Sequence, residues 1–227
     1  MKVGKFLIGA SLAMLGVSAV RADLATLQIT DPNTAVAPYP GPYADVSINR
    51  TDSTHATITF TSLTSQPGAA YYYLMGGVDV ADVNINATSF TVSPIVGSNP
   101  YPNFDTPSIS DNGAGNTSDF GTFNLTLKAF DGYTHSSSNI SFTVTNTSGT
   151  WANAASVFAN NTDGYMAASH IFVTSNPPDG NNGAVATGFS AGGGATNIVT
   201  TVPVPTTLLS GLGLLGLLAV RRASKSA

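Results

Sequence analysis

The chain has 227 residues, which suits one domain of ordinary size, and its lack of cysteine excludes disulfide bonds, thiol nucleophiles and cysteine-based metal sites. All twelve acidic residues are aspartates between Asp23 and Asp179, whereas only Arg50 and Lys128 of the eight basic residues lie away from the chain ends, so the central part carries a formal charge of −10. Nucleic-acid binding depends on clustered lysine and arginine, and this charge distribution excludes it.

The first 22 residues have the composition of a secretory signal peptide. Lys2 and Lys5 precede an apolar run over residues 6–20, and Val20-Arg21-Ala22 places small residues at the cleavage positions. The pattern predicts cleavage after Ala22, with Ala19 as the alternative. An exported chain that begins near Asp23 follows from this prediction.

Alternating side chains predict the architecture of the exported part. The first predicted strand covers residues 24–29, and an extended loop with four prolines follows it. β-Branched or aromatic residues then alternate with threonine, serine and other residues in five segments: Val46/Ile48, Ile58/Phe60, Phe90/Val92, Phe123/Leu125/Leu127 and Ile140/Phe142/Val144. This period of two is typical of half-buried antiparallel strands, and turn sequences such as Asp111-Asn112-Gly113 separate them. We therefore predict an all-β, antiparallel β-sandwich or jelly-roll-like domain over residues 23–175.

Two segments depart from the alternation. Apolar residues between Trp151 and Phe158 recur at helical spacing, which predicts one short helix that closes an end of the sandwich. Residues 171–173 form the last predicted strand. Glycine, alanine, asparagine and proline dominate residues 176–201, and their composition predicts a linker between the domain and the C-terminal tail.

The polar sequence from Asp79 to Asn86 is the best candidate for a metal site. On a strand, Asp82, Asn84 and Asn86 would project to one side, with Asp79 near the adjoining turn. Closely spaced carboxylate and amide oxygens are the ligands that calcium prefers, so we hypothesise a calcium site at these four residues. The alternative interpretation is a solvated strand face with ordinary turns.

No catalytic constellation is evident, and the sequence predicts a protein that is not an enzyme. Gly188-Phe189-Ser190-Ala191-Gly192 matches a nucleophile elbow, but in that fold the acid and the histidine follow the serine. Here the last histidine, His170, and the last aspartate, Asp179, both precede it. The three histidines, at 55, 135 and 170, show no spacing typical of a zinc site.

Two further features concern carbohydrate. Asn-x-Ser/Thr triplets, which are compatible with surface glycosylation, begin at seven asparagines: Asn49, Asn86, Asn116, Asn124, Asn139, Asn146 and Asn160. Seven aromatic residues could form platforms for sugars, although core packing is the usual role of such side chains: Tyr39, Tyr43, Tyr71, Tyr72, Tyr73, Tyr101 and Trp151. Three adjacent tyrosines on a solvated face would favour a binding module.

The C-terminal tail contains the strongest targeting signal of the chain. Val202-Pro203-Val204-Pro205 precedes an uncharged apolar run over residues 208–220, and Arg221-Arg222 follows. A helix over residues 206–220 would be about 22 Å long, so spanning a hydrocarbon core of about 30 Å requires residues from 202 onward. The basic end predicts a cytoplasmic C-terminus. Residues 202–227 are therefore predicted to contain a transmembrane sorting helix.

This order of parts resembles the PEP-CTERM class of bacterial sorting signals, and most closely its Val-Pro-Leu-Pro variant. Residues 210–216 carry the most specific part of the resemblance, while Val204 stands where the common form has glutamate. The resemblance implies recognition near Pro203–Pro205 by an exosortase, a membrane cysteine protease and transpeptidase. Four central segments are also similar to exported bacterial proteins with this type of tail, which implies location only: 54–64, 121–132, 148–157 and 170–177.

Together these features predict an exported surface or extracellular-matrix protein with a structural or interaction role. Before processing, the tail would hold it in the membrane. The first alternative is a carbohydrate-binding module of an exopolysaccharide matrix, with or without calcium, and the second is a secreted hydrolase. The expected partners are the exosortase, the membrane and a polysaccharide.

Overall fold

The computed structural model describes residues 23–64, 70–130, 132–193 and 199–201. The predicted signal peptide with Ala22 and the predicted sorting signal lie outside these residues, including Val202, Pro203, Val204, Pro205, Arg221 and Arg222. Within the described part, paired strands are all antiparallel and no α-helix is present. The all-β prediction is confirmed for these residues.

The first sheet contains seven strands in the order β16-β1-β3-β4-β13-β7, and β8 pairs with the other end of β13. Its strands are β1 (Asp23–Ile29), β3 (Ala44–Arg50), β4 (His55–Ser62), β7 (Phe90–Val92), β8 (Val96–Ser98), β13 (Asn139–Asn146) and β16 (Val199–Thr201). In β4, Ala56, Ile58 and Phe60 are buried, while the threonines between them are partly exposed. This alternation gives the sheet one apolar inner face and one hydroxyl-rich outer face.

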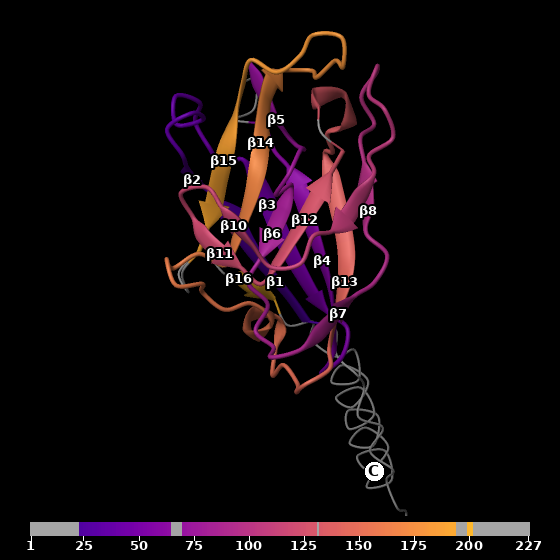
Figure 1. The fold of residues 1–227 in the computed structure, drawn as a ribbon, viewed down its shortest axis with the longest axis vertical. Helices are drawn as coiled ribbons and strands as arrows, with labels where there is room; N and C mark the ends of the chain where they lie inside the picture. The colour runs from indigo at the N-terminus through magenta and orange to yellow at the C-terminus, as the bar shows by residue number, and fades with distance from the viewer. Residues whose placement is uncertain (1–22, 65–69, 131, 194–198, 202–227) are drawn as a thin grey trace, which may run out of the picture.

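The second sheet also contains seven strands, in the order β2-β15-β14-β6-β12-β9, and β5 pairs with β14. Its strands are β2 (Asp31–Pro32), β5 (Tyr71–Met75), β6 (Ala81–Val83), β9 (Ile109–Asp111), β12 (Leu125–Ala129), β14 (Ala167–Ser175) and β15 (Ala186–Gly192). The inner faces of both sheets share one apolar core, to which Phe142 of the first sheet and Leu127 and Ile171 of the second contribute. Figure 1 shows the two sheets stacked.

A short hairpin covers part of the outer face of the second sheet. It consists of β10 (Gly115–Thr117) and β11 (Gly121–Phe123), which form a separate two-stranded sheet. Phe120 and Phe123 of the hairpin pack on Ala168 and Ala191 in a second apolar cluster. The second sheet is therefore buried on both faces at Ala168 and Ala191. Over 171–173, β14 lacks a polar alternation because the rings of Tyr133 and His170 pack against the outward-facing Phe172.

The structure corrects the predicted linker over residues 176–201. Ala186–Gly192 forms β15, which pairs with both β14 and β2, and Val199–Thr201 forms β16 beside β1. The small residues of β15 are a packing requirement, because a side chain at Gly188 would place its Cβ 2.6 Å from Asn33 Oδ1 and 2.9 Å from Ala35 Cβ. The small residues suggest a flexible linker, but in this fold they allow two chain segments to pack closely.

The predicted helix between Trp151 and Phe158 is a single 3₁₀ turn, η2 (Ala154–Val157), which packs on β1 and β3. A capping box begins it, because Asn153 Oδ1 accepts from the Ser156 backbone and Ser156 Oγ accepts from the Asn153 backbone, at 2.9 and 3.1 Å. The extended backbone of Phe158 ends it. A second 3₁₀ turn, η1, covers Tyr133–His135.

Candidate functional site

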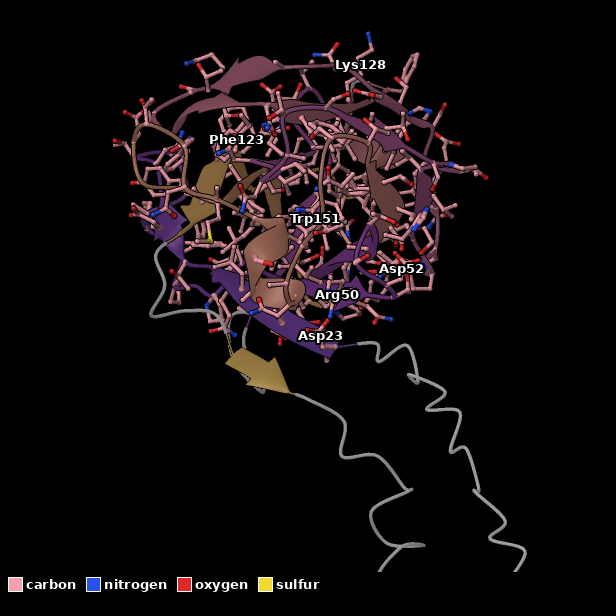
Figure 2. All side chains as sticks on the ribbon, turned by 90° about the horizontal axis from the view of Figure 1, so that it is seen from below. Asp23, Arg50, Asp52, Phe123, Lys128 and Trp151 are labelled. Atoms are coloured by element: carbon pink, nitrogen blue, oxygen red, sulfur yellow. The ribbon has the colours of Figure 1, made fainter. Side chains whose placement is uncertain are left out.

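One end of the two-sheet domain carries both its first and its last described residues. β1 begins at Asp23, the antiparallel strand β16 ends at Thr201, and Leu24 lies opposite Thr201 in the register. β3 ends here too, with Arg50 opposite Asp23. We call this the tail-proximal end, and Figure 2 views the molecule from this side. In the sequence, Asp23 directly follows the predicted cleavage site, and Thr201 directly precedes the predicted sorting motif.

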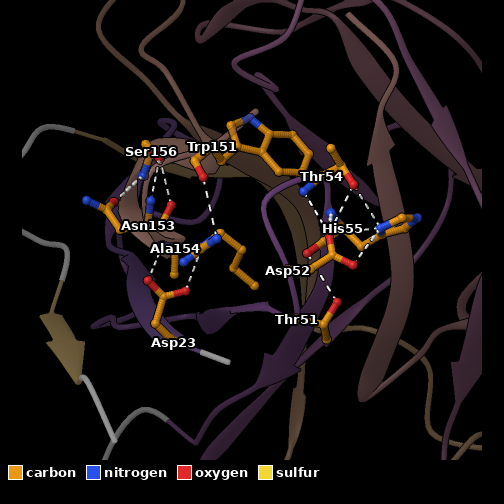
Figure 3. A network of polar contacts seen from close by, with 10 residues as sticks. Asp23, Thr51, Asp52, Thr54, His55, Trp151, Asn153, Ala154 and Ser156 are labelled. Atoms are coloured by element: carbon orange, nitrogen blue, oxygen red, sulfur yellow. Dashed lines mark hydrogen bonds and ion pairs between the residues drawn. The ribbon is translucent and has the colours of Figure 1, made fainter. Parts of the chain in front are cut away.

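An ion pair fixes the start of β1 at this end. Asp23 Oδ1 accepts a hydrogen bond from Arg50 Nε at 2.8 Å, and Oδ2 accepts one from the Ala154 backbone at 2.9 Å. The Asp23 residue is only 8% exposed, and Figure 3 shows its carboxylate directed at Ala154 of the 3₁₀ turn. The first residue of the predicted exported chain is therefore an integral part of the fold.

Trp151 connects this ion pair to the neighbouring loops. Its carbonyl accepts a hydrogen bond from Arg50 Nη1 at 3.5 Å, and its backbone N–H donates to the Ser53 carbonyl at 2.7 Å. The indole Nε1 donates to the Asn86 carbonyl at 2.8 Å, and the residue is only 2% exposed. Trp151 is a buried anchor in this fold and is not available as an exposed sugar platform.

The turn between β3 and β4 contains an exposed carboxylate–histidine contact. Asp52 Oδ1 accepts from the Thr54 and His55 backbones at 2.7 and 2.8 Å, and Oδ2 lies 2.9 Å from His55 Nδ1. The Thr54 backbone bond, followed by the His55 side chain, lowers the pKa of Asp52 below its usual range. Figure 3 shows that these contacts close the turn. These turn contacts account for an aspartate, a threonine and a histidine at this position without any catalytic role.

A polar groove of about 450 Å³ lies between two loops that the hydrogen bond from the Trp151 indole to the Asn86 carbonyl connects. One loop follows β6 and contributes Asn86 and Thr88. Asn146, the last residue of β13, and Ser148 and Thr150 in the loop after it form the other wall. Among the residues that the structure describes, no charged side chain lines the groove. Such a set of amides and hydroxyls can both donate and accept hydrogen bonds to an uncharged ligand.

The predicted calcium ligands lie in different environments. Asp82 is fully buried beneath the β10–β11 hairpin, where its Oδ2 accepts from Thr117 Oγ1 at 2.7 Å. Asp79 is partly exposed in a turn with φ 57°, and the amide nitrogens of Asn84 and Asn86 donate to the Ala159 and Ser156 carbonyls. The structure therefore departs from the expected solvated face at Asp82. Among the described residues, no group of three or more histidine or acidic side chains could hold a metal ion.

The other sequence candidates also have structural partners. Ser190 lies within β15 and its hydroxyl donates to the Asp31 carbonyl at 2.9 Å, so no strand-to-helix elbow forms around it. The neighbouring His170 contacts the Gly76 carbonyl and Thr187 Oγ1 through its two ring nitrogens, each at 2.7 Å. His135 lies 3.6 Å from Asp105. The three histidines thus have separate partners.

The three adjacent tyrosines do not form one solvated face. Tyr73 is fully buried in the core, whereas Tyr72 lies on the opposite side of β5 and packs edge-on against Tyr101, with ring centroids 5.2 Å apart. Tyr71 packs similarly against Tyr39, with centroids 5.0 Å apart. Tyr43 is buried as well. Most of the predicted aromatic platform therefore belongs to the core and its margin.

Sequence reasoning overlooked the groove, although a signal for it was present. Asn86-Ala87-Thr88 and Asn146-Thr147-Ser148 are two of the seven Asn-x-Ser/Thr triplets, and the asparagine and hydroxyl residue of each line the groove. Only the fold brings these two triplets, 60 positions apart in the sequence, onto neighbouring loops. The Asp23–Arg50 pair had no local signal, because it depends on the register of β1 and β3.

No protein-family model, curated protein or solved structure matches the chain. Among the described residues, no helix has both the length and the apolar character needed to cross a membrane.

Proposed function

We propose that this chain is an exported, non-enzymatic surface or extracellular-matrix protein. In this proposal, a β-sandwich ectodomain lies between a signal peptide and a C-terminal transmembrane sorting helix. An exosortase recognises the tail near Pro203–Pro205, and the membrane holds the chain until that step. The chain then has a structural or interaction role at the cell surface.

The observation that carries the proposal is the pairing of β1 with β16. Leu24 lies opposite Thr201, so the residues that adjoin the predicted signal peptide and the predicted sorting motif share one end of the domain. Val202 follows Thr201 directly in the sequence. A domain with both processing sites at one end can complete its fold while it is still held there, and neither cut removes a residue of the sheets.

The proposal is tested by intact-mass analysis of surface material from cells with and without the exosortase. Wild-type cells should yield a chain that starts near Asp23 and ends near Pro205. Replacing Pro203 and Pro205 with alanine should leave the tail attached, because the rigid, extended segment that the protease recognises is lost. Thr207→Ala, two residues beyond the motif, is the matched control and should be processed normally. Full-length protein that retains Arg221 in cells with an active exosortase would contradict the processing step.

A further inference from the structure

The groove at the tail-proximal end is held in shape by bonds between its two walls. Ser148 Oγ accepts a hydrogen bond from the Ser89 backbone at 3.0 Å, and the Thr147 backbone donates to the Ser89 carbonyl at 3.0 Å. The Trp151 indole and the Asn86 carbonyl form a third connection at 2.8 Å. These bonds fix both loops before any ligand arrives, so binding there requires little ordering.

Asn146 provides the hydrogen-bonding group at the base of the groove. The residue is only 6% exposed, and its Oδ1 accepts hydrogen bonds from the Ser148 backbone, the Ser148 hydroxyl and the Gly149 backbone at 3.0, 3.2 and 2.9 Å. Its Nδ2 has no protein acceptor among the described residues and is open to solvent, since the buried side-chain atoms without a partner there are Ser136 Oγ and Ser137 Oγ. This N–H₂ group is therefore available to donate a hydrogen bond to water or to a ligand in the groove.

The remaining groups of the groove indicate the chemistry of the ligand. Thr88 and Thr150 are exposed hydroxyl residues, and the partly exposed Ala87 and Ala159 add apolar surface. Within the described part of the chain no carboxylate lines the groove, although the central part of the chain carries −10. A sugar ring offers hydroxyls that both donate and accept, together with apolar C–H surfaces, and it carries no charge to conflict with this lining. The volume of about 450 Å³ lies within the usual range for ligand sites.

We propose that this groove binds a neutral saccharide unit of a polysaccharide, with Asn146 Nδ2 donating to a sugar hydroxyl and with Thr150 at the rim. This inference rests on the proposed function, because it names the matrix component that an exported surface protein would contact. It also replaces the predicted tyrosine platform with a different site, formed by two Asn-x-Ser/Thr triplets.

The test uses the full-length chain, purified in a detergent without a sugar headgroup, in affinity electrophoresis with dextran, mannan, β-glucan or alginate in the gel. At least one neutral polymer should retard the protein, and the acidic alginate should not. Asn146→Asp keeps the oxygen that closes the turn but removes the donor, and Thr150→Val removes an exposed hydroxyl. Each should weaken binding about tenfold or less, as expected for the loss of one hydrogen bond.

Matched controls separate the groove from general effects. Asn139→Asp adds the same charge at the other end of β13, and Thr91→Val removes an exposed hydroxyl from β7, outside the groove; both should bind as wild type. The inference is overturned if no neutral polymer retards the protein, or if Asn146→Asp and Thr150→Val both bind normally. If the chain binds sugar but its tail is never processed, the proposed sorting is rejected and the groove is retained. If the tail is processed but the chain binds no sugar, the saccharide site in the groove is rejected and the proposed sorting is retained.

Discussion

At the scale of single residues, the fold buries two aspartates among the described residues and stabilises them differently. Asp23 lies opposite Arg50 and accepts two hydrogen bonds, so its charge is compensated. Asp82 has no basic partner among the described residues, and its contacts are the Thr117 hydroxyl at 2.7 Å and the Leu127 backbone at 3.3 Å. Burial, to which nearby Asp79 adds, raises the pKa of Asp82 well above its usual range, and the two hydrogen bonds only partly oppose this.

The Asp82 carboxyl should therefore make stability depend on pH. Because its pKa is higher in the folded than in the unfolded chain, its contribution is complete below the unfolded pKa and is lost as pH rises through the folded pKa. Between these two values, the free energy of unfolding should fall by as much as about 1.4 kcal/mol per pH unit. Asp82→Asn keeps an oxygen acceptor for Thr117 and cannot ionise, so urea denaturation of this variant from acid to alkaline pH should lack that slope.

An exposed aspartate provides the control for Asp82. Asp111 accepts a hydrogen bond from the Gly113 backbone at 2.7 Å in an exposed turn, so Asp111→Asn also keeps its acceptor. This variant should retain the wild-type dependence on pH. The same slope in Asp82→Asn and in wild type would show that ionisation of Asp82 does not affect folding.

At the scale of elements, the sequence predicts strands well where one face is buried and the other is solvated. The alternation of Ile58 and Phe60 with threonines corresponds to β4, and that of Ile140, Phe142 and Val144 corresponds to β13. Prediction fails for β15, because its glycine, alanine and serine residues allow close approach of the end of β1 and of the loop after β2, and do not form an apolar face. Local patterns do not report which distant segment will lie against a strand.

The packing of β15 can be tested at Gly188. A valine there would direct its Cβ against Asn33 and Ala35, so Gly188→Val should lower the free energy of unfolding by about 1–3 kcal/mol, as overpacking typically does. Thr187→Ser, at the exposed neighbouring position, keeps the hydroxyl that contacts His170 and should change stability far less. Urea denaturation measures both variants. Equal stability of Gly188→Val and wild type would mean that residues 186–192 behave as the linker that the composition suggests.

The candidate site was less predictable than the strands. Amide and hydroxyl residues are common throughout this chain, so the triplets at Asn86 and Asn146 could not be distinguished locally from the other five. Their proximity follows from the connections after β6 and β13, which reach the same end of the domain. Similarly, the oxygen pattern from Asp79 to Asn86 suggested a solvated face, and only the position of the β10–β11 hairpin reveals that Asp82 is covered.

At the scale of the whole molecule, the two ends of the domain differ in their relation to the tail. Asp23, Arg50 and Thr201 mark the tail-proximal end. The connection between β14 and β15, residues 176–185, lies at the opposite end, where it forms the orange loop in Figure 1. If the chain is held through its tail as proposed, this loop faces outward, while the turn between β3 and β4 lies close to the attachment surface.

The absence of cysteine allows this orientation to be measured, because one introduced cysteine provides a unique label. Asn182→Cys lies in the 176–185 connection and Ser53→Cys lies in the turn at the tail-proximal end, and both positions are exposed. A bulky polymer-linked maleimide added to intact cells should react faster at position 182, because the attachment surface restricts approach to position 53. The two variants should react at similar rates after detergent extraction, which controls for local reactivity. Equal rates on intact cells would contradict attachment through the tail-proximal end, and faster reaction at position 53 would reverse the proposed orientation.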